Sequence, residues 1–129
     1  MPRKKYNIII PLEIYPRPSE KEISAAYLLA DFFQTDIEFI PRKNQKTADF
    51  LISGKNWELK SPTGDGERNI QHTISRALKQ SQYIIIDARY SKVNLLKIKS
   101  KINAEIKINK QIKRLLLITK SSKIIEFSR

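Results

Sequence analysis

The chain has 129 residues, which is typical of a single domain, and we expect one domain over residues 1–129. Its 25 Lys and Arg residues against 13 Asp and Glu give a formal net charge of +12, which favours a polyanionic partner, nucleic acid or an anionic membrane. The absence of Cys excludes disulfides and cysteine nucleophiles, and a single histidine, His72, excludes sites built from several histidines. No apolar run approaches the roughly 18 residues of a membrane span, so we expect a cytoplasmic protein.

The apolar pattern predicts alternating strands and helices. Ser19 followed by Glu22 has the spacing of a capping box, which predicts a helix start, and the apolar run 83–87 is typical of a strand covered on both faces. In chain order we expect strand 7–14, a helix from 19 to about 34, strand 36–40, a hairpin of strands 49–53 and 56–61, a helix over 67–81, strand 83–87, a helix over about 93–110 and a hairpin of strands 114–119 and 123–127. This αβββαβ order, followed by αββ, predicts an α/β fold with a mixed sheet in which strand 83–87 runs parallel to strand 56–61.

Charged side chains gather on the predicted hairpin 49–61. If Gly54-Lys55 forms its turn, Asp49 lies opposite Lys60 and Leu51 opposite Glu58. Because side chains alternate across a sheet, one face then carries Asp49, Glu58 and Lys60. The opposite, core-facing side carries Phe50, Ile52, Trp57 and Leu59.

Two neighbouring carboxylates beside a lysine suit phosphodiester hydrolysis. Asp49 and Glu58 offer the oxygen ligands that Mg²⁺ or Mn²⁺ prefers, and such a metal polarises phosphate and acidifies water. The Lys60 ammonium is placed to orient that water or to stabilise developing charge. A solvent-facing hairpin with a cross-strand Asp–Lys pair is the alternative interpretation, and it needs no catalytic function.

The segment Ala48-Asp49 followed by Trp57-Glu58-Leu59-Lys60 resembles the PD-(D/E)xK motif of restriction-endonuclease-like nucleases, with Ala in place of Pro. The αβββαβ order also resembles the core of that superfamily. The resemblance implies metal binding by Asp49 and Glu58 and assistance to the attacking water by Lys60. It also implies a metal ligand on the first helix, for which Glu22 is the candidate, although a capping-box role explains Glu22 equally well.

Residues 47–90 are similar to the tRNase toxin domains at the C-terminus of contact-dependent inhibition proteins, through the segments ELKSPTG, IQH and KQS. This similarity implies an RNA substrate, with tRNA a possibility, and an inhibitor or immunity protein as a further partner. Some of these toxins have a metal-independent RNase fold of the barnase, colicin and RelE kind, so the similarity leaves the chemistry open.

Basic side chains elsewhere are candidates for binding phosphate. Arg68, His72, Arg76 and Lys79 recur at helical spacing and form one stripe, which is either a phosphate-binding face or a solvated helix surface. The loop residues Arg42, Lys43 and Lys46, and Arg89 after the buried strand, complete the set. His72 is also a candidate general acid or base, because histidine titrates near neutral pH.

These patterns favour a metal-dependent nuclease acting on nucleic acid, with RNA preferred to DNA and no membrane partner. The alternatives are a metal-independent RNase using His72, Lys60 and Arg76, and a non-catalytic nucleic-acid-binding module.

Overall fold

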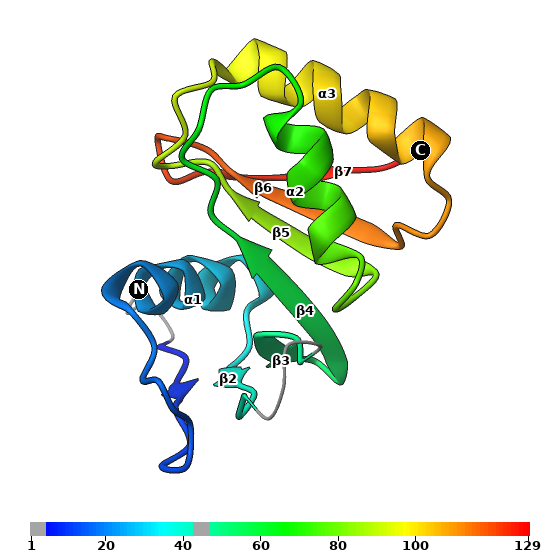
Figure 1. Ribbon diagram of the computed structural model, residues 1–129. Helices are drawn as coiled ribbons and strands as arrows, with labels where there is room; N and C mark the ends of the chain where they lie inside the picture. The colour runs from blue at the N-terminus through cyan, green and yellow to red at the C-terminus, as the bar shows by residue number, and fades with distance from the viewer. Residues whose placement is uncertain (1–4, 43–46) are drawn as a thin grey trace.

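A computed structural model describes residues 5–42 and 47–129, and within them it contains three helices and one seven-stranded sheet (Figure 1). The elements in chain order are β1 (Ile8–Ile9), α1 (Glu20–Phe33), β2 (Ile37–Phe39), β3 (Phe50–Ile52), β4 (Lys55–Lys60), α2 (Asn69–Ala77), β5 (Tyr83–Asp87), α3 (Leu95–Ile108), β6 (Arg114–Ile118) and β7 (Ile124–Phe127). The predicted α/β fold, with its αβββαβ order followed by αββ, is confirmed. Among the described helices, none has the length and apolar character required to cross a membrane.

The strands lie in the sheet in the order in which they occur in the chain, from β1 to β7. β1 is parallel to β2, and β4, β5 and β6 are mutually parallel, whereas β2–β3, β3–β4 and β6–β7 are antiparallel. The sheet is therefore mixed, and the predicted parallel pairing of β4 with β5 is confirmed. Because β4, β5 and β6 are parallel, their carboxyl ends meet at the same edge of the sheet.

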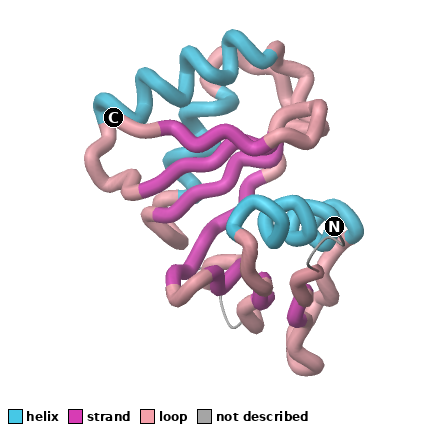
Figure 2. The backbone as a smooth tube through the Cα atoms, turned by 180° about the vertical axis from the view of Figure 1, so that it is seen from behind, coloured by secondary structure: helices cyan, strands magenta, loops and turns pink. Residues whose placement is uncertain are grey.

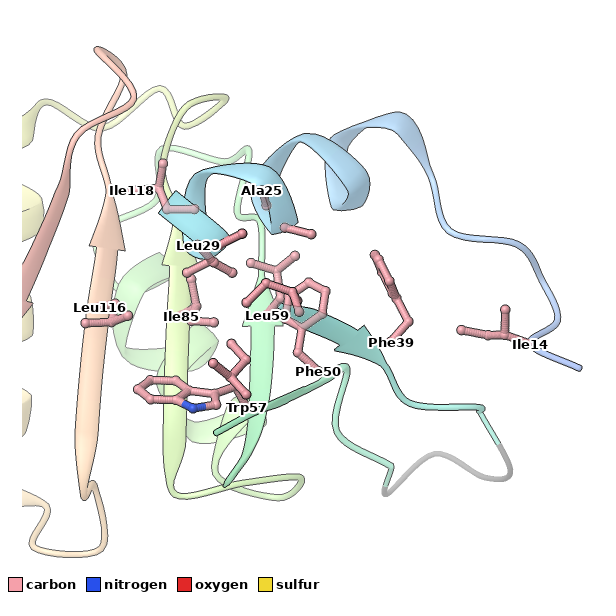
Figure 3. Packing of buried hydrophobic residues seen from close by; sticks show 14 residues of the cluster. Ile14, Ala25, Leu29, Phe39, Phe50, Trp57, Leu59, Ile85, Leu116 and Ile118 are labelled. Atoms are coloured by element: carbon pink, nitrogen blue, oxygen red, sulfur yellow. The ribbon is translucent and has the colours of Figure 1, made fainter. Parts of the chain in front are cut away.

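Helices cover both faces of this sheet (Figures 1 and 2). On one face α1 packs through Ala25 and Leu29 on a cluster that includes Trp57, Leu59 and Ile85, as Figure 3 shows. On the other face α2 and α3 pack over a second buried cluster, formed by residues that include Ile70, Ile74, Ile84, Ile86, Ile98 and Ile102. The two clusters explain the continuous apolar run of β5, because successive residues of that strand point into opposite clusters.

The predicted start of α1 is confirmed in detail. Ser19 Oγ accepts the backbone N–H of Glu22, and Glu22 Oε1 accepts the backbone N–H of Ser19, which is a complete capping box. The helix ends at Gln34, which adopts a left-handed conformation with φ of 56°. α2 is shorter than the predicted 67–81, because the chain tightens after Ala77, whose carbonyl accepts the N–H groups of both Gln80 and Ser81.

Two strand predictions are wrong. The strand expected over 7–14 consists only of Ile8–Ile9, because Pro11 has no N–H to donate and its carbonyl instead closes a turn with the Ile14 N–H. The predicted register of the β3–β4 hairpin is displaced by two residues: Ile52 pairs with Lys55, and the turn residues are Ser53 and Gly54. Both have positive φ, 48° and 80°, the backbone geometry that the twist of a tight hairpin favours.

Candidate active site

Strand β4 pairs with a different neighbour along each half of its length. Its first half, Lys55–Trp57, pairs with β3, and its second half, Glu58–Lys60, pairs with β5. On the side of β3, Asp49 continues the hairpin, because its N–H donates to the Trp57 carbonyl at 3.0 Å and its carbonyl accepts the Ile40 N–H at 2.9 Å. These two bonds fix the backbone of Asp49 beside the second half of β4.

The side chain of Asp49 is held by the backbone of β4. Its Oδ2 accepts the Leu59 N–H at 2.8 Å, so a carboxylate occupies the place where a further β3 residue would otherwise pair. With Phe50 paired to Trp57, the antiparallel register sets Asp49 opposite Glu58, rather than opposite Lys60 as predicted. The predicted face is correct, because a displacement by two residues leaves side-chain alternation unchanged.

Glu58 is buried although it carries a carboxylate, with only 5% of its surface exposed. Its Oε2 lies 3.1 Å from the Nζ of Lys60, whose side chain reaches solvent. Its Oε1 is also buried, and among the described residues it has no hydrogen-bond partner. A buried acceptor left unpaired is costly, and a group of this kind calls for a specific explanation.

The two carboxyl groups perturb each other's ionisation. Burial, reinforced by the negative charge of Asp49, raises the pKa of Glu58 to about 8, although Lys60 opposes this shift. Burial also raises the pKa of Asp49, against the hydrogen bond from Leu59, which favours its charged form. The pair therefore retains a proton near neutral pH, because two neighbouring buried carboxyl groups disfavour double ionisation.

The residues at this position fit a divalent metal. The unpaired Glu58 Oε1 and the neighbouring Asp49 carboxylate supply hard oxygen ligands, which suit Mg²⁺. The described residues contain no group of three or more His, Cys, Asp or Glu side chains arranged to hold a metal. Two carboxylates are nonetheless sufficient for Mg²⁺, which commonly takes one or two from the protein and fills its other positions with water and phosphate.

Glu22 lies near this pair but is engaged elsewhere. Its Oε1 accepts the Ser19 N–H, and its Oε2 forms an ion pair with Arg42. The negative charge of Glu22 raises the pKa of Asp49, and the positive charge of Arg42 lowers it. Of the two roles considered for Glu22, the structure contains the capping box, and its use as a metal ligand stays a prediction.

The predicted phosphate-binding residues are divided among several places. Arg42 is close enough to the carboxylates to affect Asp49, whereas Lys43 and Lys46 lie outside the described residues. The α2 stripe is exposed at all four positions, Arg68, His72, Arg76 and Lys79. It lies on the side of the helix opposite the buried Ile70, Thr73, Ile74 and Ala77 that face the sheet, so it is a surface separate from the buried Asp49–Glu58 pair.

Arg89, one of the predicted phosphate contacts, is bound to a buried carboxylate. Its Nε and Nη2 donate to the two carboxylate oxygens of Asp87 at 2.9 and 2.8 Å, and Nη2 also donates to Ser24 Oγ of α1 at 2.9 Å. Asp87 is completely buried, and Arg89 supplies its counter-charge. The pair joins the end of β5 to α1 and so contributes to stability, while phosphate binding by Arg89 stays a prediction.

Two features of the site have no signal in the sequence. The Leu59 N–H that holds Asp49 is a backbone group, and any residue except proline would provide it. The burial of Glu58 follows from packing across both clusters and cannot be inferred from its alternation with Trp57 and Leu59 alone. The predicted grouping of Asp49, Glu58 and Lys60 is nevertheless the arrangement that the structure contains.

Residues 46–124 match the family model described as the contact-dependent growth inhibition CdiA C-terminal domain. This match covers more than half of the chain, which therefore belongs to the CdiA C-terminal domain family. Membership of this family points to a role in contact-dependent growth inhibition.

Among solved structures, the chain is similar to one from a CdiA-CT/CdiI toxin and immunity complex of Burkholderia pseudomallei. The two share 19% sequence identity with a TM-score of 0.63, over 97% of this chain and 100% of the other. At this identity the likeness concerns the fold. No curated protein matches the chain.

Proposed function

We propose that this domain is a metal-dependent nuclease of the PD-(D/E)xK type that hydrolyses phosphodiester bonds in RNA. The observation that carries the proposal is the buried, unpaired Glu58 Oε1 beside Asp49, with Lys60 Nζ 3.1 Å from the other Glu58 oxygen. Without a cation, two neighbouring buried carboxyl groups repel each other when ionised, which is why the pKa of Glu58 is raised. A divalent cation held by Asp49 and Glu58 would balance their charge and occupy the unpaired Glu58 Oε1.

Each side chain then has a distinct task. Bound Mg²⁺ supplies a positive charge for a phosphate oxygen and makes a water molecule more acidic. Asp49 is oriented for binding by its hydrogen bond from Leu59, and Glu58 is oriented by Lys60. Lys60 reaches from this pair to solvent, so its ammonium is positioned to hold the attacking water and to stabilise negative charge on the phosphate.

The preference for RNA rests on family membership and on the net charge of +12. The growth-inhibition family supports a toxin role, and the similarity of segments 47–90 to tRNase toxin domains favours RNA, including tRNA, over DNA. A toxic nuclease acts where its nucleic acid is found, so we expect cleavage in the cytoplasm. The similar structure is a toxin and immunity complex, which supports an immunity protein as a partner of this chain.

The metal-independent alternative depends on His72, Lys60 and Arg76. The structure places His72 and Arg76 on the exposed face of α2, turned away from the sheet on which Lys60 lies. A non-catalytic binding module would need the basic surface but not the buried carboxylate pair. Neither alternative explains why Glu58 is buried beside Asp49 with its pKa raised to about 8.

The test is cleavage of a mixed tRNA preparation, a single-stranded RNA and a duplex DNA by the purified domain. Wild type, Glu58→Gln and Lys60→Ala are compared in Mg²⁺ and in EDTA. Glu126→Gln is the matched control, because it removes the exposed carboxylate of a β7 residue, three strands from β4 in the sheet, from its ion pair with Arg114. We expect RNA cleavage only by wild type and the control, and only in Mg²⁺. Equal activity of Glu58→Gln would refute the assignment.

A further inference from the structure

A second concave site lies at the sheet edge where β5 and β6 end and α3 begins. It is a cavity of about 210 Å³ whose apolar part is formed by Val93, Leu95 and Ile98. Thr119, Lys120 and Ser121, which follow β6, form its polar part. None of these residues belongs to the carboxylate site described above.

The cavity and the carboxylate site share an edge and a face of the sheet. Lys60 ends β4 just as Ile118 ends β6, and both strands run parallel to β5 between them. Glu58 and Lys60 are in register with Ile84 and Ile86, whose side chains belong to the cluster under α2 and α3. Val93 and Ile98 belong to that same cluster, so a ligand extending along this edge can reach both sites.

The positive charge of the chain is concentrated in its second half, the part that also forms the cavity. Residues 61–129 contain 15 Lys and Arg against 5 Asp and Glu, whereas residues 1–60 contain 10 against 8. The part that forms α2, β5, α3, β6 and β7 therefore carries +10 of the net +12. Such a concentration favours a phosphate-bearing ligand over an apolar or cationic one.

The lining suits a planar ring with polar edges. Thr119 Oγ1 and Ser121 Oγ lie 3.0 Å apart and share one hydrogen bond, and Thr119 Oγ1 also accepts the Lys123 N–H at 3.2 Å. Both hydroxyls keep capacity for a ligand, Ser121 more than Thr119. The volume is below the roughly 300–1,000 Å³ of sites for drug-sized ligands, which fits one base better than a complete cofactor. Beside the cavity, Leu95 and Leu96 remain 40% and 80% exposed, an apolar surface that a stacked base would cover.

We propose that this cavity binds one unpaired nucleobase of the RNA substrate, with Lys120 contacting an adjacent phosphate. The base lies against Val93, Leu95 and Ile98, and its polar edge meets the hydroxyls of Thr119 and Ser121. This inference deepens the proposed nuclease function, because it names single-stranded RNA next to the cleaved bond as the element that is recognised. It also predicts that fully paired RNA is a poor substrate.

The first experiment measures binding without cleavage, in the full chain carrying Glu58→Gln. Methyl NMR signals of Val93 and Ile98 are followed during titration with uridine 5′-monophosphate, adenosine 5′-monophosphate and ribose 5-phosphate. We expect saturable shifts with one or both nucleotides and much smaller ones with ribose 5-phosphate, which has no base. Equal shifts with ribose 5-phosphate, or none with either nucleotide, would overturn the proposal.

The second experiment blocks the cavity with Ser121→Trp, at an exposed position on its rim. Ser100→Trp is the control, since Ser100 is an exposed position on α3 outside the cavity lining. Single-turnover cleavage of single-stranded RNA by Ser121→Trp should need about tenfold more enzyme for half-maximal rate, the scale of one lost base stack, whereas Ser100→Trp should match wild type. Unchanged cleavage by Ser121→Trp would overturn the proposal. Nucleotide binding in the first experiment, combined with no RNA cleavage by the wild-type chain in Mg²⁺, would support the base site and refute the nuclease.

Discussion

Asp49 Oδ2 accepts the backbone N–H of Leu59 at 2.8 Å, so the side chain of the residue before β3 replaces the backbone carbonyl that would otherwise accept this hydrogen bond. This bond holds Asp49 beside Glu58 at the point where β4 changes partners from β3 to β5. The same contact therefore supports both the sheet and the proposed metal site. Its two contributions can be separated by substitution.

Asp49→Asn and Asp49→Ala should differ in stability but not in activity. The amide oxygen of Asn still accepts the Leu59 N–H, whereas Ala leaves that group unpaired, which costs about 1–3 kcal/mol. Both substitutions remove the negative charge and should abolish RNA cleavage. Urea unfolding and single-turnover cleavage measure the two effects, and an active Asn variant would show that the charge of Asp49 is not required.

The metal-free domain should lose stability as the pH rises from about 5 to about 8. The pKa of Glu58 is raised to about 8 in the folded protein, so over this range the folded state binds more protons than the unfolded state. The free energy of unfolding then falls with pH, by at most about 1.4 kcal/mol per unit for this group, and the raised pKa of Asp49 acts in the same direction.

Urea unfolding in EDTA at several pH values measures this dependence. Glu58→Gln should flatten the curve and be more stable than wild type at pH 8, because Gln has no proton to lose. Excess Mg²⁺ should also flatten it for wild type, by stabilising the ionised pair. A stability that rises between pH 5 and 8 in EDTA would contradict the ionisation described for this site.

Arg89→Ala should destabilise the domain without weakening its attraction to nucleic acid. Removing the guanidinium leaves the completely buried Asp87 without its counter-charge, a change that typically costs about 3–5 kcal/mol. Glu126→Gln breaks the exposed pair with Arg114 and should cost less than about 1 kcal/mol. A flatter salt dependence of RNA binding in folded Arg89→Ala would restore Arg89 as a phosphate contact.

Trp57→Ala should unfold or strongly destabilise the domain. Trp57 is 1% exposed, and its ring packs against those of Phe33 and Tyr83, with centroids 5.4 and 5.3 Å away. Truncating a buried Trp costs about 3–5 kcal/mol. Thermal unfolding measures the loss, and Trp57→Phe, which retains a ring, should lose much less. A stable Ala variant would mean that this cluster is not central to the fold.

Most of the fold can be predicted from the sequence, because the spacing of the apolar residues and the positions of the capping and turn residues indicate the same helices and strands. The capping box of Ser19 and Glu22 and the apolar run of β5 each depend on neighbouring residues only, and both are confirmed. The predicted register of the β3–β4 hairpin is wrong because it takes Gly54 as the first residue of the turn. In the structure Ser53 takes that position with positive φ, and Gly54 takes the second.

The candidate site was predictable in its membership but not in its environment. Alternation along β3 and β4 was enough to place Asp49, Glu58 and Lys60 on one face. The burial of Glu58 and the contact of Arg89 with Ser24 depend on how the helices cover the two faces of the sheet, and these are contacts between residues far apart in the sequence. For the same reason the cavity near Thr119 had no local signal.

The central claim is that Asp49 and Glu58 hold a metal for hydrolysis, and the chemistry of the product ends tests it most directly. We predict that mass spectrometry of RNA cleaved in Mg²⁺ finds 5′-phosphate and 3′-hydroxyl ends, that EDTA prevents cleavage, and that His72→Ala loses only part of the rate. Direct attack of water on phosphorus does not need the 2′-hydroxyl, whereas a metal-free RNase uses it. Full activity in EDTA with 2′,3′-cyclic phosphate ends would contradict the account and transfer catalysis to His72, Lys60 and Arg76.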